Sequence, residues 1–205
     1  MSNLLLHMRV ASPPSCAVRM LGEILGLKFQ MYEPNLLELE HRTAEFKKKN
    51  PMATIPVLED GDFVISESHA IMKYLLQQYG GEQREALYPS AAKIRAMVDQ
   101  CMFYDAGVFF NRLKVVALPT LLHGLPGPST ENIQDIEESF GVLEAFLTNK
   151  KYIATNDITL ADLSLGSTAT AIQVIHKLDA SKYPRCNEWL QRLNDESCFK
   201  NINAP

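Results

Sequence analysis

The strand-like patterns of this chain all lie within about its first 80 residues, and this asymmetry limits the possible fold more than any other feature. An apolar run of strand length covers residues 4–10, and residues 28–32 alternate like a second strand. Two further runs, 55–58 and 63–66, flank Asp60–Gly61, a dipeptide that favours a tight hairpin turn.

Helical periodicity fills the stretches between these strands. From Ser15 onward, apolar residues recur with a helix period as far as Gly26, a residue that commonly ends helices. Residues 36–49 also predict a helix, and Ser68 is placed to cap another helix that reaches Tyr79. The order β-α-β-α-β-β-α therefore predicts an α/β N-terminal domain over residues 1–80.

The second half is expected to be all-helical, because strand patterns fade after a predicted linker at residues 81–90. Within this domain, 91–205, a loop rich in Pro and Gly covers 119–128. Ser129 is a plausible cap, while Thr159 and Asp162 have capping-box spacing ahead of an unusually apolar helix, which we expect to be central. Helical periodicity recurs over four stretches, 91–116, 129–148, 159–178 and 185–193.

The composition is typical of a soluble globular protein, with 46% hydrophobic and 21% charged residues, and the length of 205 residues is enough for one large domain or two small ones. The formal charge of −4 and the lack of a long basic run argue against a nucleic-acid or anionic-membrane partner. The leucines before His7 are too few for a signal sequence or a membrane span.

The spacing of the cysteines shows no C-x-x-C pair and no zinc or disulfide pattern. Reduced thiols in a cytoplasmic protein are therefore expected at Cys16, Cys101, Cys186 and Cys198.

Ser12 is the first candidate for chemistry. It follows a strand and precedes Pro13 and Pro14, residues that are tolerated in the first turn of a helix. A hydroxyl in the positive field of a helix N-terminus can donate a hydrogen bond to a thiolate, which lowers the pKa of the thiol. The alternative is that Ser12 only caps the helix, a role that serine favours.

Residues 50–69 are interpreted as a strand that ends in X-Pro, a tight hairpin and an acidic helix start. Pro56 removes a ladder donor, so its strand is predicted to lie at a sheet edge or to bend. A cis bond at this position would leave the backbone of Ile55 exposed to a ligand. Glu67 can accept from an ammonium group while Ser68 and the helix N–H groups bind a carboxylate, which suits an α-amino acid; the alternative is a solvated acid and a simple cap.

The other candidates have ordinary alternatives. His41 and His69 are surface histidines by default, and the scattered histidines predict no metal site. Cys16 lies near a helix start, where a thiolate is stabilised, but a buried apolar role is the simpler interpretation. Four aromatic residues of the long helix belong either to the core or to an apolar cleft between the halves: Phe103, Tyr104, Phe109 and Phe110.

In this order, the motifs resemble those of the cytosolic glutathione S-transferases, over essentially the whole chain and closest to the insect delta/epsilon group and its unclassified relatives. The motifs are Ser-Pro-Pro-Ser-Cys-Ala-Val-Arg, Asn-Pro-Met-Ala-Thr-Ile-Pro-Val-Leu, Glu-Ser-His-Ala-Ile and Thr-Leu-Ala-Asp. The resemblance implies a thioredoxin-like N-terminal domain, an all-α C-terminal domain, a homodimer and glutathione as co-substrate. The implied activity is addition of the glutathione thiolate to apolar electrophiles, as in detoxification.

The resemblance also assigns roles to individual residues. Ser12 matches the serine that activates the thiol, and Ile55, before the family's cis-proline Pro56, matches the residue whose backbone pairs with the cysteinyl part. Glu67 and Ser68 match the residues that bind the γ-glutamyl end. Of the two histidines, His41 resembles the one near the glycyl end, and His69 stands where many relatives carry arginine.

Ala53 departs from the family pattern, because relatives usually carry Gln-His where this chain has Met52 and Ala53. That histidine helps to hold the glycyl carboxylate, and a lost hydrogen bond to a charged group costs about 1.5–3 kcal/mol, or roughly 10- to 100-fold in affinity. Relatives often have a further C-terminal segment, so an open substrate site is expected here. Two alternatives follow: a weakly catalytic or non-catalytic protein that binds apolar ligands, and a thiol–disulfide oxidoreductase that depends on Cys16.

Overall fold

The computed structural model describes residues 4–202, apart from the side chains of residues 121–123. These residues form two compact units, of which the first comprises residues 4–84 with 201–202 and the second residues 85–200. The division falls within the predicted linker, 81–90, which contains the short helix α4 (Gln83–Leu87). The domain boundaries inferred from the sequence stay predictions.

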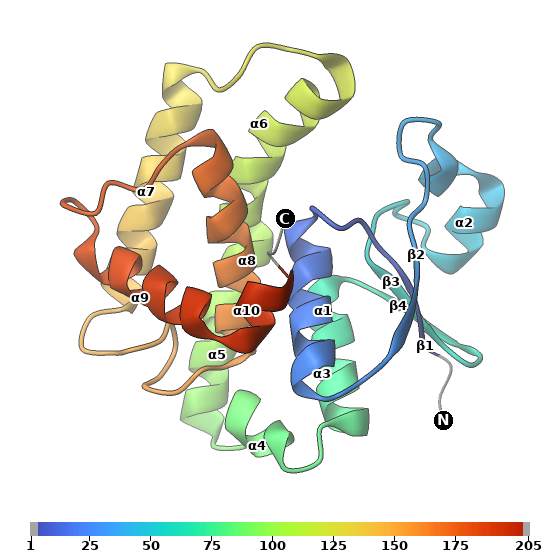
Figure 1. Ribbon diagram of the computed structural model, residues 1–205, viewed down its shortest axis with the longest axis horizontal. Coiled ribbons are helices and arrows are strands. Elements are labelled where there is room, and N and C mark those ends of the chain that lie inside the picture. The colour runs from blue at the N-terminus through green and yellow to red at the C-terminus, as the bar shows by residue number, and fades with distance from the viewer. Residues whose placement is uncertain (1–3, 203–205) are drawn as a thin grey trace. The chain divides into compact units, whose positions relative to one another are not determined.

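The first unit contains a four-stranded mixed sheet with the strand order β2-β1-β3-β4 (Figure 1). β1 pairs in parallel with β2, while β1 with β3 and β3 with β4 pair antiparallel. The turn between β3 and β4 includes Gly61 at a φ of 60°, as expected for the hairpin that Asp60–Gly61 predicts. The strand bounds are β1 (Leu4–His7), β2 (Phe29–Tyr32), β3 (Val57–Asp60) and β4 (Phe63–Ser66).

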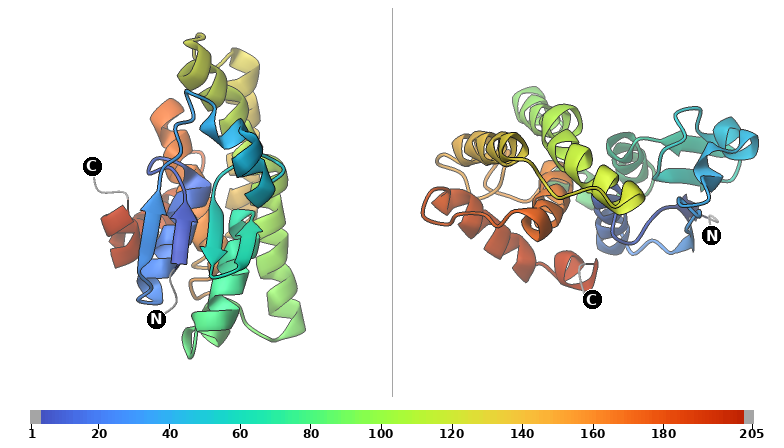
Figure 2. Two further views of the ribbon diagram at one scale, coloured as in Figure 1. Left: turned by 90° about the vertical axis from the view of Figure 1, so that its right-hand side faces the viewer. Right: turned by 90° about the horizontal axis from the view of Figure 1, so that it is seen from above.

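Helices cover both faces of this sheet, as Figures 1 and 2 show. α1 (Pro13–Ile24) and α3 (Ser68–Tyr79) pack together on one face, and η1 (Glu40–Arg42) and α2 (Ala44–Lys49) lie on the other. Because side chains alternate along a strand, Leu6 of β1 and Leu58 of β3 share one face and His7 shares the opposite face with Glu59. The two leucines are fully buried in the core, whereas His7 contacts Phe46 of α2.

Two predictions for this unit are wrong. The helix expected over 36–49 is reduced to η1 and α2, because Asn35 accepts from the backbone N–H groups of residues 37 and 38 and Leu39 is left-handed at φ 59°. The strand after Pro56 does not lie at a sheet edge, because β3 pairs with β1 on one side and β4 on the other. Pro56 precedes β3 by one residue and therefore removes no ladder hydrogen bond from it.

The second unit is helical. Beyond α4 it contains α5 (Ala92–Tyr104), the π-helical turn η2 (Asp105–Phe109), α6 (Phe110–His123), α7 (Thr130–Phe146), α8 (Leu160–Ile175) and α9 (Pro184–Asp195). A final helix that the sequence did not predict, α10 (Ser197–Ile202), begins in this unit. None of the helices in the described part combines the length and apolar character needed to cross a membrane.

α8 is the central helix of this unit, as its apolar sequence predicts. Asp162 is fully buried, and its carboxylate accepts from the backbone N–H and hydroxyl of Thr159 at 2.8 and 2.9 Å, which confirms the capping box. The same carboxylate accepts from the N–H of Ile153 at 2.8 Å and from the indole of Trp189 at 2.9 Å. One acidic side chain therefore ties the start of α8 to the preceding loop and to α9.

The helix predicted over 91–116 is interrupted and extended. η2 separates α5 from α6, and α6 continues past Pro119 to His123. Its end coincides with Gly124, a left-handed residue at φ 60° whose N–H bonds the carbonyl of Thr120 at 3.0 Å. The expected loop at 119–128 is thus shorter than predicted, because Gly124 rather than Pro119 is the effective stop. The predicted cap at Ser129 is confirmed by its bond from the N–H of Asn132 at 3.1 Å.

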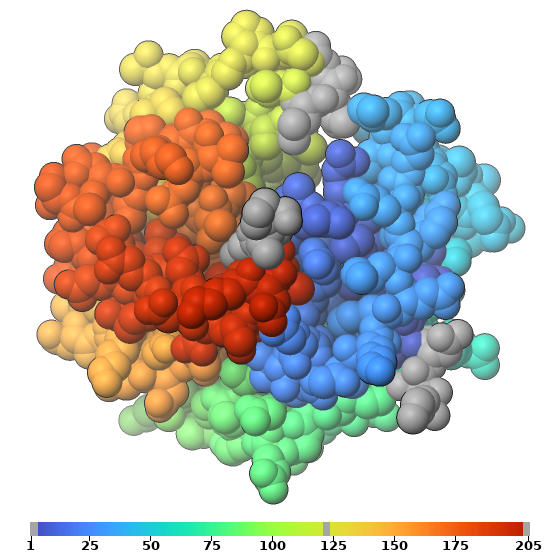
Figure 3. Space-filling view, in the orientation of Figure 1, coloured from blue at the N-terminus to red at the C-terminus, as the bar shows by residue number. Residues whose placement is uncertain are grey.

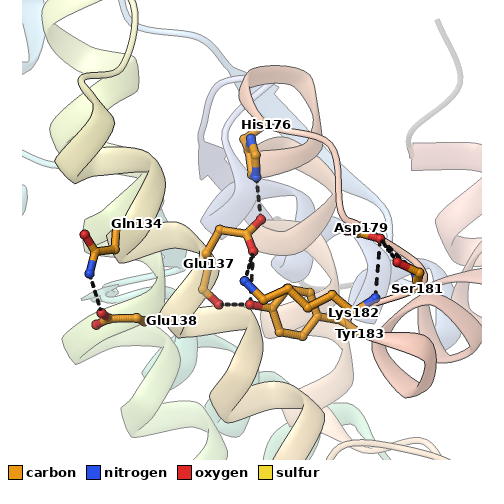
Figure 4. A network of polar contacts seen from close by, with 8 residues as sticks. All are labelled: Gln134, Glu137, Glu138, His176, Asp179, Ser181, Lys182 and Tyr183. Atoms are coloured by element: carbon orange, nitrogen blue, oxygen red, sulfur yellow. Dashed lines mark hydrogen bonds and ion pairs between the residues drawn. The ribbon is translucent and has the colours of Figure 1, made fainter.

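The segment between α8 and α9 lies on the outer surface of the helical unit on the face that Figure 3 shows, in orange to red. Glu137 of α7 holds this segment (Figure 4). Its two carboxylate oxygens contact the ring of His176 and the ammonium of Lys182, each at 2.6 Å. The hydroxyl of Tyr183 donates to the same carboxylate at 3.0 Å and to the Glu137 carbonyl at 2.8 Å. Glu137 therefore holds the segment between α8 and α9 against α7 near both ends of that segment.

Candidate functional site

One row of residues across the sheet defines the candidate site in the first unit. Tyr32 pairs with His7, His7 with Val57 and Val57 with Ser66, so these residues lie side by side in register. Three of the strands end at this row and β3 begins there. Every loop attached to the row consequently leaves the sheet from the same end, which is uppermost in Figure 1.

These loops carry all the residues of the N-terminal domain that the sequence indicates for glutathione. Ser12 follows β1, His41 follows β2 on η1, and Ile55 with Pro56 leads into β3. The remaining three follow β4 at the start of α3: Glu67, Ser68 and His69. The topology thus gathers residues that are as much as 57 positions apart, the difference between 69 and 12, at one end of one sheet.

Ser12 is the N-cap of α1 by its extended backbone, with φ −86° and ψ 118°, yet its side chain makes no capping hydrogen bond. Pro13 and Pro14 occupy the first helical positions and have no N–H to offer it. Within residues 4–202, no partner is found for the half-buried hydroxyl. The simple capping role is therefore not observed, and the hydroxyl is available at the positive end of a twelve-residue helix.

Ile55 offers backbone groups at the same end of the sheet. The Ile55–Pro56 peptide bond is cis, and Pro56 is buried while Ile55 is half-buried. In the described chain, neither the N–H nor the carbonyl of Ile55 has a hydrogen-bond partner. Polar backbone groups are almost always paired when they are removed from water, so this pair is suited to an extended ligand.

A buried asparagine shapes the loop before Ile55. The amide nitrogen of Asn50 donates to the carbonyl and the hydroxyl of Thr54, both at 2.9 Å, and its amide oxygen accepts from the N–H of Met52 at 3.1 Å. The Asn50 carbonyl accepts from the N–H of Ala53 at 2.9 Å. Ala53 is held at φ 55°, a left-handed conformation that costs a residue with a β-carbon roughly 1–2 kcal/mol.

The start of α3 supplies a second set of polar groups. Ser68 is the first helical residue rather than the cap, a correction of one position, and Glu67 is the N-cap at φ 69°. Such conformations concentrate at functional sites. The exposed Glu67 side chain makes no capping bond, and neither the N–H nor the hydroxyl of Ser68 has a hydrogen-bond partner among the residues described. An acid beside the N-terminus of a helix matches the two charges of an α-amino acid.

The two histidines of this end differ in their surroundings. His41 is not an ordinary surface residue, because its Nδ1 atom is buried and has no hydrogen-bond partner in the described part of the chain. Burial, followed by the nearby charge of Arg42, lowers the pKa of His41, which favours the neutral ring. His69 is half-buried at the second position of α3.

Cys16 is a buried residue of α1, as the simpler interpretation predicts. Its thiol donates to the carbonyl of Val10 at 3.1 Å, and burial raises the pKa of Cys16 despite the opposing charge of Arg19. This environment favours the thiol over the thiolate, which counts against the thiol–disulfide oxidoreductase. No cluster of three His, Cys, Asp or Glu side chains suited to a metal occurs in the part of the chain that the structure describes.

The predicted substrate residues separate within the helical unit. Phe109 is fully buried against the ring of Phe140, with the centroids 5.6 Å apart, so it is a core residue and not a lining residue. Tyr104 is half-buried, and its hydroxyl donates to the carbonyl of Ser139 at 3.1 Å. Phe103 is 72% exposed and Phe110 is half-buried, so both retain surface for an apolar ligand.

A shallow hollow of about 240 Å³ lies beside η2 on the same unit, lined by Gly107, Val108, Asn111, Arg112 and Val115. Arg112 is fixed there by Asp135 of α7, with nitrogen and oxygen 2.5 Å apart. The amide of Asn111 donates to the carbonyls of residues 106 and 107, at 3.3 and 3.0 Å, where the π-helical turn disturbs the regular pattern. The lining of the hollow is therefore mixed in polarity, and its two polar side chains, Asn111 and Arg112, are both hydrogen-bonded.

The chain has close relatives of known family. Residues 6–83 match the sequence model of the glutathione S-transferase N-terminal domain, and residues 128–192 match that of the C-terminal domain. Glutathione S-transferase 1 of Manduca sexta is 36% identical over 197 residues, which cover 95% of this chain and 89% of the relative. The chain belongs to the glutathione S-transferase family. It is an enzyme of this family, with relatives in insects, as the sequence predicts.

Solved structures confirm the glutathione transferase fold. An epsilon-class glutathione S-transferase from the housefly Musca domestica has a TM-score of 0.92 and 36% identity, covering 98% of this chain and 92% of the other. A glutathione transferase homologue from Drosophila mojavensis, with bound glutathione, has a TM-score of 0.93 and 36% identity, covering 100% and 92%. The predicted α/β thioredoxin-like domain followed by a helical domain is confirmed.

Two parts of this glutathione S-transferase had no role assigned from sequence. Asn50 belongs to a recognised motif, but only its burial reveals that it organises the loop before Ile55. The residues around the hollow carried one usable signal, a glycine at position 107 in the middle of a long helical pattern. Gly107 lies in η2, and such π-helical turns are frequent at functional sites.

Proposed function

We propose that this enzyme binds glutathione at the loop-bearing end of the sheet and adds its thiolate to apolar electrophiles. The observation that carries the proposal is the convergence of unpartnered polar groups there: the Ser12 hydroxyl, the Ile55 backbone groups, and the N–H and hydroxyl of Ser68, none with a partner in the described residues. The relative from Drosophila mojavensis has bound glutathione, which supports the same ligand here.

Each group has a proposed task. Glu67 accepts from the γ-glutamyl ammonium, and Ser68 with the α3 N–H groups binds the α-carboxylate. Ile55 pairs with the cysteinyl backbone beside Pro56, while His41 and His69 lie nearest to the peptide's charged ends. Ala53 offers no hydrogen bond to the glycyl carboxylate, so the affinity at that end is expected to be weak.

Ser12 is the proposed catalytic residue. Its hydroxyl donates a hydrogen bond to the glutathione sulfur and, with the field of α1, stabilises the thiolate. The thiol proton passes to solvent, the sulfur attacks the electrophilic carbon, the new carbon–sulfur bond forms, and a leaving group such as chloride departs with the electron pair of its bond. Phe103, Tyr104, Phe110 and the hollow beside η2 are proposed to contact the electrophile. A homodimer and a cytoplasmic location stay predictions.

Steady-state conjugation of glutathione to a chloronitrobenzene tests this proposal with two matched serine variants. Ser12→Ala is expected to lower kcat roughly 10- to 100-fold, the effect of losing a hydrogen bond to a charged group. Ser68→Ala is expected to raise KM for glutathione with kcat little changed, because it contacts a part of the ligand that does not react. Equal kcat values for wild type and Ser12→Ala would remove Ser12 from the mechanism, and no binding of glutathione by the wild type would refute the function.

A further inference from the structure

A shared carboxylate joins three elements beneath the loops of the first unit. Glu59 of β3 lies on the sheet face that α2 covers, with 21% of its side chain exposed. One of its oxygens accepts from the ammonium of Lys49, the last residue of α2, at 2.6 Å. The same oxygen bonds the Nε2 atom of His7 on β1. Glu59 is thus a direct polar link between α2 and the sheet.

Further contacts connect His7 to η1 through Tyr32. His7 is 5% exposed, and its ring packs edge-on against Phe46 of α2 and Tyr32 of β2, with centroids 5.7 and 5.4 Å away. The hydroxyl of Tyr32 donates to Glu40, the first residue of η1. The other oxygen of Glu40 accepts from the N–H of Asn35 at 2.8 Å. A continuous set of contacts therefore runs from Glu59 to the turn that carries His41.

The charge on Glu59 supports a fastening role. Burial alone would raise the pKa of Glu59, but the hydrogen bonds from Lys49 and His7 outweigh it and hold that pKa below its usual value. The carboxylate is therefore ionised at neutral pH, and its bonds are the stronger, charge-assisted kind. A glutamine at this position keeps the shape of the side chain and removes the charge.

α2 depends on such contacts. It is six residues long and buries only Phe46, and an isolated helix of that length is not stable in water. The link through Glu59 and the contact of Phe46 with His7 are the side-chain ties to the sheet in this part of the described chain. Loss of the hydrogen bonds to Glu59 is therefore expected to loosen α2 and the adjoining η1.

We propose that Glu59 is a positioning residue that fixes η1 and α2 on the sheet and thereby sets the affinity of the enzyme for glutathione. This inference rests on the proposed function. Glu59 lies in β3, beneath the loops that carry the candidate site. It acts on glutathione indirectly, through the position of His41 and its neighbours. It therefore governs how well the glycyl end is held and leaves the reaction of the bound thiolate unchanged.

The test compares Glu59→Gln and Lys49→Met with Glu45→Gln and Lys48→Met. The control pair lies on the same helix, 2.9 Å apart, but both side chains are about three-quarters exposed and do not reach the sheet. The two test variants are expected to raise the glutathione Kd and KM roughly tenfold, equivalent to about 1.4 kcal/mol, with kcat and the KM of the electrophile unchanged. Calorimetry and steady-state kinetics measure these values.

Hydrogen–deuterium exchange of the ligand-free variants gives a readout that needs no glutathione. Faster exchange over residues 40–49 in Glu59→Gln and Lys49→Met, but not in the controls, is the expected result. Unchanged exchange, or wild-type glutathione affinity in both test variants, overturns the positioning role while leaving the proposed function intact. A parallel fall in kcat also overturns it, because that points to general damage. Absence of binding by the wild type overturns both proposals together.

Discussion

At the residue scale, Asn50 shows how one buried amide can shape a binding loop. Its side chain uses both donors on Thr54 and its acceptor on Met52, and it is completely buried. The loop between these partners includes the strained Ala53 and leads directly to Ile55. A structure that holds a residue at positive φ must supply compensating contacts, and the Asn50 side chain supplies them here.

We predict that Asn50→Ala lowers the free energy of unfolding by about 2–4 kcal/mol, because it removes a buried side chain and leaves several polar groups without partners. Glutathione KM should rise as well, because the loop no longer fixes Ile55. Urea denaturation and steady-state kinetics measure the two effects. Asn156→Ala is the matched control, since Asn156 is exposed and its amide oxygen accepts from the N–H of Lys151 at 3.1 Å. If the two variants lose similar stability, Asn50 does not organise the loop.

Sequence reasoning at this scale can propose residues by their position in the chain, but it misses residues that work through distant contacts. Ser12 and Glu67 stand next to helix starts, and that position is visible in the order of residues. The role of Asn50 depends on which carbonyl its amide reaches, which no local pattern encodes. The same limit applies to Phe109, whose helical spacing fits a core position and a cleft position equally well.

At the scale of elements, the signals that carry local chemistry predicted the structure best. The Asp60–Gly61 turn and the capping boxes at Ser129 and Thr159 are all present, because each is closed by bonds between residues near in sequence. The predictions failed where tertiary contacts outweigh local preference. α6 continues through Pro119, and the π-helical turn η2 interrupts a pattern that looked uniform.

The connection between α8 and α9 yields a prediction of pH dependence. Burial alone would raise the pKa of Glu137, but bonds from Lys182, His176 and Tyr183 lower it overall. In the unfolded chain a glutamate has a pKa of about 4.3. The unfolded state therefore takes up the proton first, so the stabilisation is complete above that value and is lost as pH falls through the lower folded pKa.

Glu137→Gln is accordingly expected to cost about 1–2 kcal/mol at pH 7, because hydrogen bonds to a charged group are replaced by weaker ones. The difference from wild type should shrink below about pH 4.3, where Glu137 of the unfolded chain takes up a proton while folded Glu137 is still ionised. Urea denaturation at a series of pH values measures it. Glu138→Gln is the control, since Glu138 is exposed and accepts a hydrogen bond from Gln134, as Figure 4 shows. A constant difference across the whole pH series would contradict this account.

At the scale of the whole molecule, the candidate site exists because of sheet register. Ser12, His41, Ile55 and Ser68 belong to four segments, and they converge because Tyr32, His7, Val57 and Ser66 form one row. The alternating elements predicted the strands, but the order β2-β1-β3-β4 was implied only by family resemblance. Register over four-residue strands depends on long-range pairing, which sequence periodicity does not specify.

Ligand binding at this site is coupled to the stability of the whole chain. A ligand that binds only the folded state stabilises it by RT ln(1 + [L]/Kd), about 2.7 kcal/mol at a hundred times Kd. Ala53 is expected to limit that gain, since the resemblance to the family predicts a histidine at this position. Ala53→His restores the missing donor, and histidine tolerates the left-handed backbone found here better than most residues.

We therefore expect Ala53→His to bind glutathione at least tenfold more tightly, which adds about 1.4 kcal/mol at equal ligand concentration well above Kd. For a chain of this length, that raises the glutathione-induced increase in Tm by roughly 3–6 °C, measured by thermal unfolding with and without ligand. Ala53→Gly separates the two possible causes, because it relieves the backbone at φ 55° without adding an imidazole. If glutathione raises the Tm of Ala53→Gly as much as that of Ala53→His, backbone strain and not the missing imidazole limits the affinity for the glycyl end of glutathione.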